Sequence, residues 1–111
     1  FALARLASVI DKLVVYPDMM QRNLDALGGL VFSQRVLLAL TQAGMSREDS
    51  YSAVQRNAMK VWREGADFLT ELTSDDEVTS HIPVAELKAV FDLGYHTQRV
   101  DHIFERVFRD A

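Results

Sequence analysis

The chain has 111 residues, of which 49% are hydrophobic and 25% charged, and it contains no cysteine. This length and composition predict one globular domain and exclude a disordered chain, a disulfide scaffold and a thiolate metal site. A formal net charge of −4 offers no basic surface to nucleic acid or to an anionic membrane. The longest uncharged run, Val36–Ser46, is too short to span a bilayer, and no stretch of these residues has the pattern expected of a signal peptide. Because Phe1 is already in helical phase, we expect the chain to be a piece of a longer protein.

Hydrophobic residues recur at helical spacing from the start of the chain. The apolar stripe of Phe1–Tyr16 predicts a first helix, which Pro17 ends because the residue before a proline avoids the α region. A short second helix is expected at about 18–27, ended by Gly28-Gly29. Residues 30–43 are apolar on nearly all sides, which predicts a central and deeply buried helix.

Ser46 is the clearest N-cap in the sequence, and it predicts a helix over 47–64 that Gly65 ends. The residues of this helix expected to face inward are Tyr51, Val54, Ala58, Val61 and Trp62. Further helices are expected at about 67–72, 75–80, 84–91 and 95–109. No run alternates with the period of a β-strand, so the sequence predicts an all-α fold, a compact bundle of five to seven helices.

Patterns typical of catalytic and metal sites are largely missing. The histidines His81, His96 and His102 form no His-x-x-x-His pair, which favours surface or capping roles and no metal ion. No Gly-x-Ser-x-Gly sequence marks a serine nucleophile. Gly28-Gly29 favours a tight turn between helices over a phosphate-binding loop, because no P-loop lysine accompanies it.

Two polar patterns carry alternative interpretations. Arg56, Lys60 and Arg63 form a basic stripe on one helix, either a solvated face, which we favour, or a site for an anionic partner. Ser33-Gln34-Arg35 opens an otherwise apolar helix, and a buried Arg35 would need a carboxylate partner such as Asp25 or Asp101.

Several sequence blocks together resemble one enzyme family. Residues 14–25, VVYPDMMQRNLD, resemble the junction that leads into the C-terminal domain of bacterial adenylosuccinate lyases. The resemblance continues, in the family's order and approximate spacing, through residues 29–40, 46–51, 54–59 and 100–108. It therefore covers nearly the whole chain, although Ser50 stands where the family usually has Ala.

The resemblance implies a purine-biosynthesis enzyme of the fumarase/aspartase superfamily. Such lyases cleave adenylosuccinate to AMP and fumarate, and SAICAR to AICAR and fumarate, by β-elimination without a metal or organic cofactor. They are cytoplasmic homotetramers whose active sites are assembled from three subunits. By this resemblance the partners of the chain are the remainder of the lyase chain, other lyase subunits and a small-molecule substrate, with no nucleic acid and no membrane.

The resemblance also divides the chain and limits its activity. Residues 1–16 would be the end of a central-domain helix and residues 17–111 the all-α C-terminal domain. The family's catalytic loop, Ser-Ser-x-Met-Pro-x-Lys-x-Asn, and its two histidine regions are absent, so no residue of this chain is expected to be catalytic and the chain alone is expected to be inactive. Ser33 and Arg35 are the candidates for substrate binding, because helix N–H groups and an arginine can hold an anion. In the alternative interpretation, Arg35 only pairs with a carboxylate of its own domain.

A function of another class remains open on these residues. The chain could be an independent helical protein-interaction module whose partner surface is the apolar stripe of Phe1–Val15. The two functions differ in what covers this stripe, which is either a neighbouring helix of the same protein or a foreign one.

Overall fold

The structure, a computed structural model, describes residues 1–109. These residues form helices joined by turns and contain no β-strand, so the predicted all-α fold is confirmed. In chain order the elements are α1 (Ala2–Asp11), α2 (Pro17–Asp25), the 3-10 helix η1 (Leu30–Phe32), α3 (Ser33–Gln42), α4 (Arg47–Glu64), α5 (Phe68–Thr73), α6 (Asp76–Thr79), α7 (Val84–Val90), α8 (Gly94–Thr97) and α9 (Val100–Phe108).

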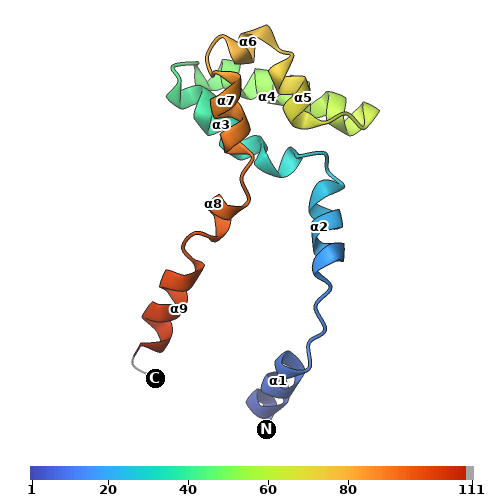
Figure 1. Cartoon of the computed structure of the whole chain (residues 1–111), viewed down its shortest axis with the longest axis vertical. Coiled ribbons are helices and arrows are strands. Elements are labelled where there is room, and N and C mark those ends of the chain that lie inside the picture. Colours follow the sequence, from blue (N-terminus) through green and yellow to red (C-terminus); the bar gives the residue numbers. More distant parts are fainter. Residues whose placement is uncertain (110–111) are drawn as a thin grey trace.

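Helices α3 to α7 pack into a bundle around one hydrophobic core (Figure 1). Helix α4 packs against both α3 and α5, while α7 closes the bundle by contacting α3 and α5. The largest apolar side chains that are fully buried in this core are Val36, Leu40, Phe68, Leu72, Val78 and Leu87. These five helices form the bundle that the sequence predicts.

Helix α4 begins and ends where the local signals predict. The Ser46 hydroxyl oxygen accepts a hydrogen bond from the Asp49 N–H at 3.1 Å, which satisfies one of the unpaired donors of the first turn. At the other end Gly65 adopts a left-handed conformation with φ +69° and donates its N–H to the Val61 carbonyl at 3.0 Å. Helix α4 therefore needs no tertiary information to set its ends.

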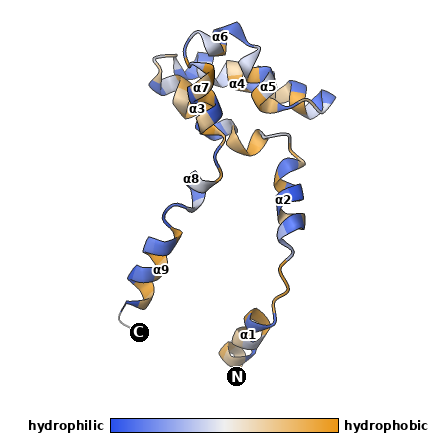
Figure 2. Ribbon diagram, viewed as in Figure 1, coloured by the Kyte–Doolittle hydropathy of each residue, from blue (hydrophilic) through white to orange (hydrophobic). Residues whose placement is uncertain are grey.

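Two arms extend from the bundle, one formed by α1 and α2 and the other by α8 and α9 (Figure 1). They give the chain extents of 58 × 33 × 23 Å. Both terminal helices carry an apolar face that the bundle does not cover (Figure 2). The exposed hydrophobic residues of α1 and α9 are Leu3, Leu6, Val9, Ile10, Val100, Ile103, Phe104, Val107 and Phe108.

The arms and the start of α3 are where the helix predictions are wrong. Helix α1 ends at Asp11 rather than at Tyr16, and the helix expected at 95–109 is divided into α8 and α9. Short helices depend on tertiary packing, and neither arm has a core to pack against. The helix expected at 30–43 opens with the tighter turn η1, in which Phe32 N–H bonds to Gly29 O at 3.0 Å, before α3 begins.

The inward face of α4 also differs in part from the prediction. Val54 and Val61 are buried and Ala58 is half-buried, but Tyr51 is 57% and Trp62 71% exposed. The face that α4 buries is completed by the small or polar residues Ser50, Ala53 and Asn57. A hydrophobic pattern assigns polar residues such as Ser50 and Asn57 to the surface. The predicted inward face was therefore shifted towards the aromatic side chains of Tyr51 and Trp62.

No single helix within residues 1–109 has the length and apolar composition required to cross a membrane. One pair of segments, Pro17–Asp25 with Leu30–Gln42, meets the length and composition criteria jointly, but a bend of 74° separates them.

Candidate functional site

The polar residues Ser33-Gln34-Arg35 form the first turn of α3, directly after η1. The Arg35 Nη1 group donates to the Val90 carbonyl at the end of α7 and, at 3.1 Å, to the Asp92 carbonyl beyond it. The guanidinium also lies 4.0 Å from the centroid of the Tyr95 ring. Arg35 thus joins α3 to the segment that leads from α7 into α8.

These contacts correct the expectation for the partner of Arg35. Within the described residues neither Asp25 nor Asp101 forms an ion pair with Arg35, and its hydrogen bonds go to backbone carbonyls instead. The carbonyls at a helix C-terminus lack partners within the helix and carry partial negative charge. They can therefore satisfy a guanidinium without a carboxylate.

A depression of ≈ 210 Å³ lies beside Arg35. The residues that line it come from α3, α7 and α8 and are Arg35, Leu38, Ala39, Gln42, Val90 and Tyr95. Ser33 is not among them, because two residues along an α-helix correspond to a rotation of about 200° around its axis. The structure therefore places Arg35 at a depression but does not bring Ser33 to the same one.

The basic stripe of α4 is used largely within the fold. Arg56 forms ion pairs with Asp75 at 2.7 Å and Glu77 at 2.8 Å, and Lys60 pairs with Glu71 at 2.9 Å. These pairs join α4 to α5 and to the start of α6. Arg56 and Lys60 therefore pair with carboxylates of their own fold, which neither interpretation of the stripe had included.

Asp75 is the centre of a polar network that the sequence analysis missed. Its Oδ2 accepts hydrogen bonds from Arg56 and, at 2.7 Å, from Nδ2 of the fully buried Asn57, while its Oδ1 accepts from the Glu77 N–H at 3.1 Å. Burial raises the pKa of Asp75, but the hydrogen bonds from Arg56 and Asn57 and the positive charge of Arg56 lower it more, so its pKa lies below the ordinary value. The only sequence feature that could have pointed to this network is Asn57 inside a predicted helix, and an asparagine there does not identify its partner.

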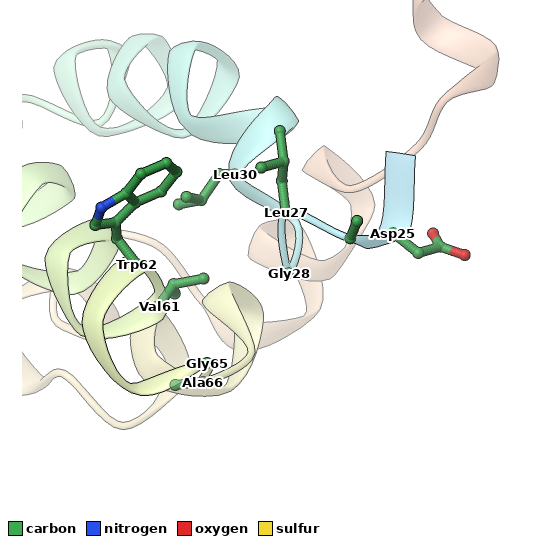
Figure 3. Close-up of a pocket in the computed structure, with 9 residues that line it drawn as sticks. Asp25, Leu27, Gly28, Leu30, Val61, Trp62, Gly65 and Ala66 are labelled. Atoms are coloured by element: carbon green, nitrogen blue, oxygen red, sulfur yellow. The ribbon is translucent and has the colours of Figure 1, made fainter. Parts of the chain in front are cut away.

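A second pocket, of ≈ 370 Å³, lies between the turn after α2 and the end of α4 (Figure 3). Gly28 lies at its base with φ +55°, and its carbonyl accepts a hydrogen bond from the Phe68 N–H at 2.9 Å. A Cβ atom at Gly28 would lie 2.8 Å from the Ala66 carbonyl oxygen. Gly28 is therefore needed for close helix packing, which agrees with the predicted turn.

No group of three or more metal-binding side chains gathers anywhere within residues 1–109. His81 lies at the end of α6, where its Nδ1 is 3.0 Å from the Glu77 carbonyl, a capping contact of the kind predicted for a surface histidine. The candidate site of this chain is the Arg35 depression, whose lining offers one cation and no Ser, Cys or His side chain.

A family model and several curated relatives all match this chain to one enzyme, adenylosuccinate lyase. Residues 29–107 match the family described as "Adenylosuccinate lyase C-terminus". The chain is 50% identical to adenylosuccinate lyase of Helicobacter pylori (strain J99) over 97% of its own length and 27% of that protein's length. It is 42% identical to adenylosuccinate lyase of Thermotoga maritima and 38% identical to that of Bacillus subtilis, covering 96% of this chain and 25% of each relative. The chain spans about a quarter of the length of these relatives, and it belongs to the adenylosuccinate lyase C-terminal family.

Proposed function

We propose that this chain is the C-terminal domain of an adenylosuccinate lyase. The complete enzyme would cleave adenylosuccinate to AMP and fumarate, and SAICAR to AICAR and fumarate, by β-elimination in purine biosynthesis. The observation that carries this proposal is the 38–50% identity to three bacterial adenylosuccinate lyases over 96–97% of the chain. Because the chain spans about a quarter of those relatives, its contribution is to a larger enzyme rather than a complete reaction.

The arms suggest how the domain joins the rest of that enzyme. In this proposal residues 1–16 are the end of a central-domain helix, and residues 17–111 form the C-terminal domain. The exposed apolar face of α1 supports this division, since such a face is stabilised only when another helix covers it. The covering helices would belong to the remainder of the chain and to other subunits of a cytoplasmic homotetramer.

The proposal predicts that lyase activity belongs to the complete enzyme and not to residues 1–111. We expect the purified 111-residue chain to leave adenylosuccinate unchanged. The protein encoded by the longer open reading frame should convert adenylosuccinate to AMP and fumarate. Both proteins are assayed by the change in ultraviolet absorbance of the purine as adenylosuccinate is cleaved. Turnover by the 111-residue chain alone, or no turnover by the longer protein, would contradict the proposal.

Within this domain we propose Arg35, together with Ser33, as the residues that approach the substrate. Arg35 supports the proposal by its position at the ≈ 210 Å³ depression, and Ser33 by its half-buried position in the first turn of the same helix. Arg35→Ala in the complete enzyme is the test, and we expect a raised KM. Unchanged kinetics with lowered stability would leave Arg35 only its contacts to the α7 carbonyls.

One observation favours a second function. The apolar face of α1 is exposed, as an independent helical protein-interaction module would require. The coding sequence upstream of Phe1 distinguishes the two functions. An uninterrupted frame that carries Ser-Ser-x-Met-Pro-x-Lys-x-Asn and the histidine regions supports the lyase, and a frame that starts at or near Phe1 supports the module.

A further inference from the structure

The ring of Tyr95 lies against the guanidinium of Arg35. Its ring is half-exposed on α8, and the Arg35 guanidinium stands 4.0 Å above the ring centroid. A guanidinium in this position is attracted by the negative face of the ring. Helix α8 lies outside the bundle (Figure 1), and this contact joins it to α3.

The hydrogen bonds of Arg35 are confined to one end of its guanidinium. Nη1 makes both contacts to carbonyls, those of Val90 and Asp92. A guanidinium has five N–H donors, so three remain on Nε and Nη2. Among the described residues no group accepts a hydrogen bond from these atoms, and neither is a buried unpaired group. The Nε–Nη2 edge has the geometry that binds a carboxylate or phosphate through two parallel hydrogen bonds.

We propose that Tyr95 is a positioning residue that holds Arg35 ready to bind an oxyanion. The two carbonyls fix Nη1, the Tyr95 ring fixes the plane of the guanidinium, and the Nε–Nη2 edge remains for a carboxylate or phosphate oxygen pair. This inference rests on the proposed function, because the oxyanion would be a carboxylate or the phosphate of the lyase substrate.

The surroundings of Arg35 are compatible with an anion. Gln42 is a further side chain with N–H donors at the depression. The carboxylate of Asp92, the residue whose carbonyl accepts from Arg35, accepts a hydrogen bond from the Gly94 N–H at 2.9 Å and so contributes to the turn into α8. The depression of ≈ 210 Å³ has room for a carboxylate or phosphate group.

Steady-state kinetics of the complete enzyme test the inference. We expect Arg35→Ala to raise KM about tenfold or more, as for loss of a charged hydrogen-bond pair. Tyr95→Ala should raise KM about threefold and leave kcat within about twofold, and Tyr95→Phe, which keeps the ring, should resemble the wild type. Tyr51→Ala, another half-exposed tyrosine, is the matched control and should change neither parameter.

The outcomes separate this inference from the function on which it rests. No change with Arg35→Ala would contradict the substrate-binding role of Arg35. A raised KM with Arg35→Ala but not with Tyr95→Ala would overturn only the role of Tyr95, as would an equal loss with Tyr95→Phe. Product inhibition identifies the anion: weaker inhibition of Arg35→Ala by fumarate indicates a carboxylate, weaker inhibition by AMP a phosphate, and no change in either overturns the inference.

A spectroscopic measurement on the 111-residue chain is independent of activity. The Tyr95 ring current should shift the Arg35 Nε–H resonance, and the shift should persist in Tyr95→Phe and disappear in Tyr95→Ala. Addition of inorganic phosphate or fumarate should move the same resonance in the wild type. A resonance at its random-coil position in the wild type would show that the stack does not form in solution and would overturn the inference.

Discussion

Asp75 provides the most direct test of how the bundle is held together. Asp75→Ala removes three hydrogen bonds at once, because this carboxylate caps α6, receives the buried Asn57 amide and pairs with Arg56. Loss of the cap costs about 1 kcal/mol. Asn57 Nδ2 keeps its hydrogen bond to the Ala53 carbonyl, but its second N–H is left buried without an acceptor, which costs about 1–3 kcal/mol more. The ion pair adds at most about 1 kcal/mol, because the Arg56 side chain is 45% exposed.

These contributions share one side chain and do not add fully, so we expect Asp75→Ala to lower the free energy of unfolding by about 3 kcal/mol. For a chain of this size that corresponds to a fall in Tm of roughly 10–20 °C. The measurement is urea and thermal unfolding of the 111-residue chain followed by circular dichroism at 222 nm. Trp62 fluorescence is a poor probe, since this side chain is already largely exposed in the folded state.

Two variants control for trivial effects of the substitution. Asp76→Ala, in the next position and exposed, should change the free energy of unfolding by less than about 0.5 kcal/mol. Asp75→Asn keeps one acceptor oxygen and should lie between the wild type and Asp75→Ala. If Asp75→Ala and Asp76→Ala are equally mild, the Asp75 network does not hold α4 and α6 together and this reasoning is wrong.

Three further predictions concern pH, glycine and a buried hydroxyl. Because the pKa of Asp75 is lowered in the folded state, its stabilisation is complete above about pH 4 and is lost as the pH falls, so wild type and Asp75→Asn should converge in urea unfolding at acid pH. Gly28→Ala should lower the free energy of unfolding by about 2 kcal/mol more than Gly65→Ala, since both have positive φ but only Gly28 has a backbone carbonyl oxygen 2.8 Å from the added Cβ; equal losses would contradict the close packing. Ser50→Ala should cost less than about 1 kcal/mol in the same assay, because the buried hydroxyl has a long contact of 3.4 Å to Thr41, and a larger loss would mean that this hydroxyl has a stronger partner.

The parts of the fold that could be predicted are those set by local chemistry. Ser46 and Gly65 define α4 to the residue, because a cap hydroxyl and a left-handed glycine act within a few positions of the backbone they satisfy. The same holds for the turn at Gly28-Gly29, where positive φ at both residues follows from the absence of a side chain. Such signals need no knowledge of the tertiary fold.

The candidate site was predicted only in part, because its partners are distant in sequence. Arg35 was identified as a polar residue in an apolar helix, but its carbonyl partners lie 55 and 57 positions away and leave no trace in residue type, since every residue has a carbonyl. The Asn57–Asp75 contact is similarly non-local, with 18 positions between the two residues. Charge alone predicts a carboxylate partner for Arg35, but the acceptors are the carbonyls of Val90 and Asp92 at and beyond the end of α7.

The exposed arms show where hydrophobic periodicity does not predict burial. In the bundle, each apolar stripe faces another helix, and hydrophobic periodicity therefore predicts which elements are buried. In α1 and α9 the periodicity is equally clear, yet every large hydrophobic side chain remains exposed and both helices are shorter than expected. A stripe without a partner contributes little to helix stability, because burial supplies most of the free energy that fixes a short helix. The apolar stripe of each arm is thus an uncovered surface, and in the proposed function the remainder of the lyase covers it.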